Sequence, residues 1–235
     1  GARGGAVSWR AMKVFRQRVI QPELLDHSAP EDAALNLADI IRLNAQFGGH
    51  NILRQLLRRA LPVSDTTHEK FTVLDVGAAS GDTARVIAEE FPEAFTVSLD
   101  LHAFHLRLAP HPKLVADSFQ LPFRDNSFDY AFSSLFLHHF TEKQILTLLR
   151  ESARVARRAV LVSDLERNLF SYLFLPVTKP FFKWHWITVH DGCISVKAAF
   201  QADELAQLLR EAGLKNVDVQ VHRPAFRLSA IGMTT

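Results

Sequence analysis

A glycine-containing turn is the first place in this 235-residue chain where residue types and spacing indicate chemistry. Asp75 precedes Gly77, and Gly81 follows at the start of a helix-forming stretch. Glycine permits a sharp turn and a close approach of a ligand, and a helix N-terminus offers free N–H groups and a positive dipole end. Asp100 ends the next apolar run, where a carboxylate can accept hydrogen bonds from ribose hydroxyls. Together these residues indicate a pocket for a nucleoside-type cofactor.

The glycine spacing narrows the class of cofactor. A dinucleotide-binding turn needs G-x-G-x-x-G, but Ala79 stands at the middle glycine position. The chain has no G-x-x-x-x-G-K-[ST] run, and neither of its two tyrosines, Tyr130 and Tyr172, begins a Tyr-x-x-x-Lys pair. Asp-x-Gly-x-x-x-Gly, with an acid about twenty residues further on, resembles the first motif of class I S-adenosylmethionine (SAM)-dependent methyltransferases.

Three later segments extend this resemblance, which is to the small-molecule and quinone-type branch of the family. Residues 116–118 (ADS) are similar to the third motif, and residues 121–129 (LPFRDNSFD) to the family's LPF-x-D-x-S-F-D segment. Residues 133–140 (SSLFLHHF) follow at the end of an expected fourth strand, where open α/β sheets bind ligands. The resemblance implies SAM as the cofactor and S-adenosylhomocysteine as the product.

The resemblance also implies roles for individual residues. The backbone of residues 77–81 would cradle the aminoacyl part of SAM, and Asp100 would bind the ribose. Leu101 would pack on adenine, and Asp117 would receive the adenine amino group. The full expected cofactor set is Asp75, Gly77, Ala78, Ala79, Gly81, Asp100, Leu101, Asp117, Ser118, Ser134 and Arg42.

Three of these residues have a second interpretation. Asp75 can serve only to order the turn, and Asp117 can cap a helix. Arg42, ahead of a double-glycine helix break, is either a partner for the SAM carboxylate or a solvated side chain.

Three histidines are candidate catalytic residues: His138, His139 and His190. An imidazole can deprotonate a phenol or another hydroxyl as the methyl group is transferred. One of the adjacent pair is expected to touch cofactor or substrate, and the alternative is a structural hydrogen bond that holds the loop. His190 and Asp191 either form a base dyad that reaches the acceptor or cap a turn.

No metal centre is predicted. The two close histidine groups are 102/105 and 138/139, and neither has a convincing set of partner carboxylates in the sequence. Asp164 and Glu166 follow the expected fifth strand, a region where catechol-type metal-dependent methyltransferases use acids. A divalent ion therefore stays open as an alternative.

The composition limits the partners. The formal net charge is only +2 and the charges are scattered, so no nucleic-acid partner is expected. A single cysteine, Cys193, excludes an internal disulfide and fits a cytoplasmic location. No apolar run of about 18 residues and no secretory signal are present, so no transmembrane helix is predicted. These features leave the oligomeric state open.

Strand and helix patterns alternate from residue 71 onward. They predict a Rossmann-like, doubly wound α/β fold with a mostly parallel seven-stranded sheet. The expected strands are 71–76, 95–100, 113–116, 128–133, 159–164, 216–221 and 225–232, and the helices between them are about 80–91, 141–156 and 201–213. The expected organisation is a flexible lead or tag at 1–11, a helical lid at 12–65 and a SAM-binding domain at 66–235.

Residues 166–199 depart from this alternation and are expected to form an apolar cap insertion. They include the runs LFSYLFLP at 169–176 and FFKWHW at 181–186. So much apolar surface must be buried, face a ligand or form an interface, with peripheral membrane contact as a further alternative. The insertion therefore favours an apolar acceptor.

These observations predict a SAM-dependent methyltransferase acting on an apolar aromatic or polyketide-like small molecule. A hydroxyl oxygen is the favoured site because histidines are available as bases. The alternative enzyme is a methyltransferase of quinone or lipid precursors. The alternative of another class is a non-catalytic methyltransferase-like binding or scaffold subunit, which the intact first motif and Asp100 argue against.

Overall fold

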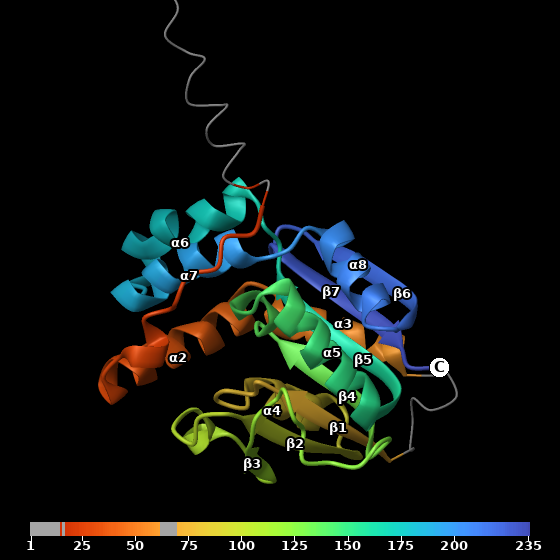
Figure 1. Cartoon of the computed structure of the whole chain (residues 1–235). Helices are drawn as coiled ribbons and strands as arrows, with labels where there is room; N and C mark the ends of the chain where they lie inside the picture. The colour runs from red at the N-terminus through yellow and green to blue at the C-terminus, as the bar shows by residue number, and fades with distance from the viewer. Residues whose placement is uncertain (1–14, 16, 62–69) are drawn as a thin grey trace, which may run out of the picture.

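The computed structural model describes residues 15, 17–61 and 70–235, and its centre is one seven-stranded sheet (Figure 1). The strand order is β3-β2-β1-β4-β5-β7-β6, with β7 antiparallel to β5 and β6 and the other neighbours parallel. The strands are β1 (Phe71–Val76), β2 (Ala94–Asp100), β3 (Lys113–Val115), β4 (Phe128–Ser134), β5 (Ala156–Leu165), β6 (Lys215–His222) and β7 (Arg227–Met233). The predicted fold class is confirmed.

Alternating side chains of the central strands serve two hydrophobic cores, one on each face of the sheet. Val73 of β1 packs into the core that includes Leu56, below α3 (Gly49–Ala60) and α4 (Asp82–Glu90). Leu74 points into the opposite core with Leu148, below α5 (Glu142–Val155) and α8 (Ala202–Glu211). This two-sided burial follows from the two-residue period of a strand and makes the sheet doubly wound.

The strand order reverses between β1 and β4. The chain moves outward from β1 through β2 to β3, and then crosses back to β4 on the other side of β1. At such a switch point the loops after the two central strands leave on opposite sides and open a ligand crevice at their carboxyl ends. The glycine turn after β1 and the histidine loop after β4 are therefore placed beside each other.

The helices ahead of β1 have two different positions. Gly48, with a left-handed φ of 90°, separates α2 (Pro30–Gln46) from α3. α3 covers one face of the sheet, whereas α2 packs on α7 (Trp186–Ala198) of the insertion. Of these two helices of the expected lid, α2 is thus the one that packs on the insertion. The expected lead at 1–11 and parts of the lid (12–14, 16 and 62–65) lie outside the described residues.

The apolar insertion forms two packed helices, α6 (Leu169–Phe182) and α7, seen at the upper left of Figure 1. At its base the fully buried Arg167 pairs with Glu204 of α8, with Nη1 2.9 Å from Oε2. Phe47, at the break after α2, makes edge-to-face contacts with Phe174 and Phe182 of α6, so part of the aromatic surface is buried internally. Among the described helices, none is long and apolar enough to cross a membrane.

Candidate active site

The glycine turn joins β1 to α4 through three residues with left-handed backbone. Gly77, Ala79 and Gly81 have φ values of 72°, 45° and 70°. The N–H groups of Gly77 and Ala78 both donate to the carbonyl of Leu99 at 2.9 Å, which ties the turn to β2. The turn thus presents its backbone at the carboxyl edge of the sheet, immediately before the N-terminus of α4.

The two glycines are required by close packing. A Cβ on Gly81 would lie 2.7 Å from the Cα of Ala109, and a Cβ on Gly77 would lie 2.3 Å from the ring of Phe136. Ala109 follows η3 (His105–Leu108), the short helix after β2, and Phe136 belongs to the loop after β4. The turn is therefore in contact with the segments that follow both neighbouring strands.

Asp100, at the end of β2, is a buried carboxylate held by three donors. Its Oδ2 accepts a hydrogen bond from the N–H of Ala79 at 3.0 Å, and its Oδ1 accepts one from the N–H of His102 at 3.0 Å. His105 Nδ1 lies 3.4 Å from the same Oδ1. Burial alone would raise the pKa of Asp100, but the hydrogen bonds from His105, His102 and Ala79 hold it below its ordinary value. Asp100 is thus an ionised acceptor beside the glycine turn.

The pKa of Asp75 is shifted in the direction opposite to that of Asp100. Burial, followed by the charges of Asp100 and Asp82, raises its pKa to about 8. Its Oδ2 is buried and has no hydrogen-bond partner among the described residues. A buried carboxylate of this kind is costly for the protein unless a cation or donor joins it, and such groups concentrate at functional sites.

Three other expected cofactor residues also follow strands at the carboxyl edge of the sheet, and they differ in exposure. Leu101 is exposed, and Ser118 is buried. Asp117 is exposed, and its Oδ1 accepts a hydrogen bond from the N–H of Phe119 at 2.8 Å. No helix follows Asp117, so the suggestion that it caps one was wrong; its side chain closes a turn.

A small cavity lies between the N-terminus of α4, the α2–α3 break, the end of β4 and the start of β7. Its lining residues are Asn44, Gly49, His50, Leu53, Asp82, Thr83, Ser134 and Arg227. The buried Arg227 donates to Asn44 Oδ1 at 2.6 Å, and Asn44 Nδ2 donates to Asp82 Oδ2 at 3.1 Å. Burial lowers the pKa of Arg227 to about 10, against the opposing charges of Asp164 and Asp82, so it remains a cation at neutral pH.

Arg42, another expected cofactor residue, does not line this cavity. Its guanidinium donates to Asp39 Oδ1 at 3.0 Å and to the carbonyl of Phe182 at 3.2 Å, and it lies over the ring of Trp184. Arg42 therefore joins α2 to the insertion, while Ser134 and Arg227 line the cavity beside the turn. Sequence reasoning missed Arg227, which opens an otherwise apolar strand.

The histidine loop begins with Leu135, which has a left-handed φ of 51°, and ends with the short helix η4 (Leu137–His139). His138 is buried, and its Nδ1 lies 2.6 Å from Oδ1 of Asp164 at the end of β5. The N–H of Leu137 donates to the other oxygen of Asp164 at 3.1 Å. Burial disfavours the imidazolium, but the charge and hydrogen bond of Asp164, followed by the charge of Glu23, raise the pKa of His138.

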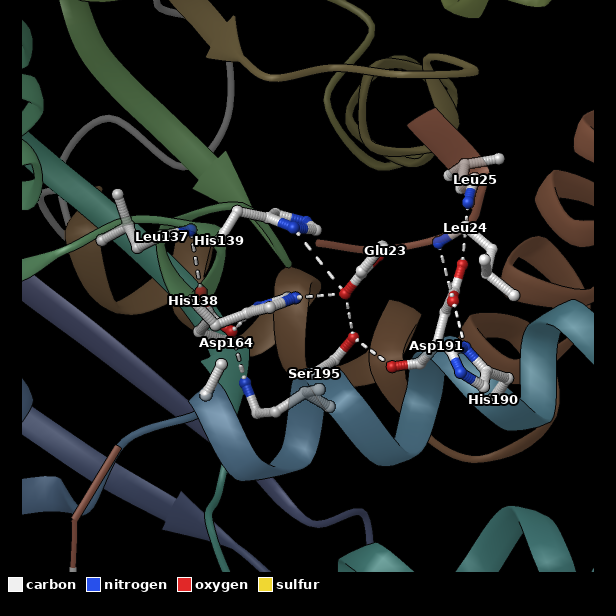
Figure 2. A network of polar contacts seen from close by, with 12 residues as sticks. Glu23, Leu24, Leu25, Leu137, His138, His139, Asp164, His190, Asp191 and Ser195 are labelled. Carbon is white, nitrogen blue, oxygen red and sulfur yellow. Dashed lines mark hydrogen bonds and ion pairs between the residues drawn. The ribbon is translucent and has the colours of Figure 1, made fainter. Parts of the chain in front are cut away.

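A segment far away in sequence completes this side of the site. We call residues 17–28 the strap, because they run along α7 and η4. Figure 2 shows its residues Glu23, Leu24 and Leu25 beside the histidine loop and α7. Arg18 of the strap donates to the carbonyls of Ala198 and Phe140 at 2.7 and 2.9 Å. The strap places Glu23 between the two histidines, with its Oε1 3.8 Å from His138 Nε2 and 3.7 Å from His139 Nδ1.

The position of the strap bears on the expectations for the histidine pair and for His190 with Asp191. The expected absence of partner carboxylates for the histidine pair was wrong, because Asp164 and Glu23 both reach it. The half-exposed His190 contacts Asp191 at 2.9 Å, and Asp191 accepts the N–H groups of Leu24 and Leu25 from the strap. Asp191 therefore anchors the strap, whether or not His190 reaches an acceptor.

The comparisons with known proteins identify a methyltransferase domain in this chain. Residues 74–162 match the family model described as a methyltransferase domain. Over 129 residues the chain is 32% identical to a demethylmenaquinone methyltransferase of Corynebacterium urealyticum, covering 54% of this chain and 53% of that relative. A demethylmenaquinone methyltransferase of Geobacillus kaustophilus is 28% identical over 186 residues, covering 67% of this chain and 76% of the relative. The chain thus spans about half the length of the Corynebacterium relative.

Solved structures show the same fold. A SAM-dependent methyltransferase of Aquifex aeolicus superposes with a TM-score of 0.55 at 17% identity, over 78% of this chain and 89% of that one. A phosphoethanolamine N-methyltransferase of Haemonchus contortus, in complex with S-adenosylhomocysteine, gives 0.53 at 20% identity, over 75% and 39%. At these identities the likeness concerns the fold.

Proposed function

Because this chain belongs to the class I SAM-dependent methyltransferases, we propose that it methylates a hydroxyl oxygen of an apolar aromatic or polyketide-like small molecule. The observation that carries the proposal is the contact between Phe136 and Gly77. It brings the histidine loop directly against the turn expected to hold the aminoacyl part of SAM. A proton acceptor and a methyl donor are then neighbours, which is the arrangement that O-methylation requires.

The residues around the turn fit SAM in charge. The orphaned Oδ2 of Asp75 offers an acceptor in the neighbourhood of the cationic aminoacyl end, and Arg227 offers a buried cation for its carboxylate. The carboxylate of Asp100 is the acceptor for the ribose hydroxyls. When bound, SAM supplies an activated methyl group on a sulfonium. The protein therefore needs to position the acceptor and remove its proton.

The histidine pair is suited to proton removal. The hydrogen bond from His138 Nδ1 to Asp164 leaves Nε2 directed toward Glu23 (Figure 2). His139 is about one-third exposed and is therefore the member of the pair that an acceptor can reach. Asp164 acts through His138 by fixing its orientation and stabilising its protonated form.

The insertion supports an apolar acceptor. Its aromatic side chains Phe174, Phe182 and Trp184 gather around Phe47 at the α2–α3 break. The remaining exposed apolar side chains of this region are Leu169, Phe170, Leu173, Val177, Phe181 and Trp186. These surfaces can accept a flat apolar molecule better than a charged one.

A quinone or lipid precursor is the second candidate acceptor. It is favoured by the similarity to two demethylmenaquinone methyltransferases and by the exposed apolar side chains of α6. Product analysis by mass spectrometry and NMR separates it from the first candidate, because it identifies both the acceptor and the methylated atom.

Calorimetric titration with SAM and S-adenosylhomocysteine tests the cofactor half. We expect micromolar binding that Asp100→Ala abolishes and that Asp203→Ala, an exposed carboxylate on α8, leaves unchanged. Transfer of a labelled methyl group from SAM to phenols, naphthols and quinone precursors tests the acceptor half. Absence of SAM binding in the folded wild type would overturn the proposal, and binding with methyl transfer only to carbon or nitrogen would overturn its choice of atom.

A further inference from the structure

We propose that Glu23, His138 and His139 bind one divalent transition-metal ion, and that Asp164 orients one of its ligands. This metal site lies beyond the methyl-transfer proposal and does not depend on it. The three ligand atoms, Glu23 Oε1, His138 Nε2 and His139 Nδ1, all lie within 4.8 Å of one another (Figure 2).

The distances suit a shared ion better than direct hydrogen bonds. Glu23 Oε1 is 3.8 Å from His138 Nε2 and 3.7 Å from His139 Nδ1, which is longer than a hydrogen bond. Ligands at about 2.1 Å from a tetrahedral zinc ion are about 3.4 Å apart. The two distances from Glu23 to the histidines would each have to shorten by a few tenths of an ångström. The two imidazole rings would have to approach each other by a larger amount to reach that geometry.

The orientation of His138 is that of a metal ligand. Its Nδ1 lies 2.6 Å from Asp164 Oδ1, so the ring N–H points to the carboxylate and the lone pair of Nε2 points toward Glu23. Carboxylate–histidine–metal arrangements use this second contact to fix the tautomer and raise the basicity of the ligand. Asp164 is itself held by the N–H groups of Leu137 and Leu165 at 3.1 and 2.7 Å.

Glu23 is also held in place. It is a buried carboxylate on the strap, and its Oε1 accepts a hydrogen bond from the hydroxyl of Ser195 on α7. Arg18 and Asp191 fix the strap on either side of it, through the carbonyl of Ala198 and the N–H of Leu24. The strap therefore brings the third ligand to two histidines that are adjacent in sequence.

The ligand types select the class of ion. Two imidazole nitrogens and one carboxylate oxygen favour Zn²⁺, Co²⁺, Mn²⁺ or Fe²⁺ over Ca²⁺ and Mg²⁺, which prefer oxygen. Three protein ligands leave at least one position for water or another oxygen, as in catalytic rather than structural sites. An ion held there would activate an acceptor hydroxyl in place of a free imidazole.

Metal binding to chelator-treated protein tests the site without any methyl transfer. We expect one equivalent of Zn²⁺ to bind by calorimetry, and Co²⁺ to give the visible absorption of a site with nitrogen and oxygen ligands. Glu23→Gln and His139→Ala should each weaken Zn²⁺ binding by roughly tenfold or more, and Asp164→Asn by about 10- to 100-fold. His102→Ala, in the other close histidine group, should retain the wild-type affinity.

The variants and controls distinguish loss of metal binding from misfolding. His139 is partly exposed, so His139→Ala is the variant least disturbed in packing, and circular dichroism and SAM titration verify that each variant is folded. Absence of stoichiometric Zn²⁺ and Co²⁺ binding, or wild-type affinity in both Glu23→Gln and His139→Ala, would overturn the metal site. Either result would leave SAM binding, and with it the proposed methyl transfer, intact.

Discussion

His138 Nδ1 lies 2.6 Å from Oδ1 of Asp164, and both side chains are almost completely buried. The pair joins the ends of two adjacent parallel strands, because His138 follows β4 and Asp164 is the penultimate residue of β5. Burial opposes both charges, but the interaction between them raises the pKa of His138 and lowers that of Asp164. Each residue thus favours the charged form of the other.

Asp164→Asn should reduce kcat by about 10²- to 10⁴-fold while leaving SAM binding nearly unchanged, because the amide neither fixes the tautomer of His138 nor stabilises its protonated form. In chelator-treated wild-type enzyme, kcat should fall as the pH drops through a pKa above the ordinary 6.5 of histidine, and in the variant this inflection should move to lower pH. Steady-state rates across pH measure both effects. Glu166→Gln is the matched control, since Glu166 pairs with Arg223 instead. A wild-type kcat in Asp164→Asn would contradict the role proposed for the pair.

Asp75→Asn should stabilise the protein without SAM, and more so at pH 8.5 than at pH 5.5. The folded pKa of Asp75, about 8, lies above its ordinary 3.8, so the folded state is penalised as pH rises between these values. The neutral amide removes this penalty, and we expect the gain at pH 8.5 to exceed the gain at pH 5.5 by on the order of 3 kcal/mol. Denaturant unfolding at the two pH values measures it. Asp203→Asn, which removes an exposed carboxylate, should show no such pH-dependent gain, and an equal gain in both variants would contradict burial of Asp75 as the cause.

Sequence patterns predicted the sheet closely because each strand carries its own signal. The expected strand at 71–76 coincides with β1, and the others differ from the observed strands by a few residues at their ends. The Asp75 and Gly77–Gly81 motif is equally local, since its strand, turn and helix are consecutive in the chain. Such elements need no information about distant contacts.

The strap could not be predicted from the sequence in this way. Glu23 precedes His138 by more than a hundred residues and stands in no recognisable motif, so only the packing of the strap on α7 brings it to the site. α6 was missed for a local reason, because Pro176 and Pro180 argue against a helix. Its ends are favoured by Asn168, whose side chain accepts the N–H of Ser171, and by the left-handed backbone of Lys183.

Gly81→Ala should cost more stability than Gly213→Ala. Both glycines have left-handed backbone, so the added Cβ strains each by about 1–2 kcal/mol. At Gly213 the Cβ would meet nothing within 4 Å, whereas at Gly81 it would lie 2.7 Å from Ala109 and Pro110. Thermal unfolding and SAM titration measure the difference, and SAM binding should be lost in the Gly81 variant alone. Equal effects of the two substitutions would show that backbone strain, and not close packing of the turn, accounts for the cost.

Ala79→Gly should stabilise the protein, by on the order of 0.5–1 kcal/mol. Ala79 has a left-handed φ of 45°, where its Cβ is unfavourable, and this cost exceeds the entropy that glycine adds to the unfolded chain. SAM binding should persist, because the hydrogen bond from the N–H of residue 79 to Asp100 Oδ2 remains. Ala78→Gly is the matched control: Ala78 is not left-handed and packs with Leu106 and Ala109, so its truncation should destabilise. Thermal unfolding of both variants and the wild type measures these changes in stability. A loss of stability in Ala79→Gly comparable to that in Ala78→Gly would mean that the turn is unstrained at residue 79.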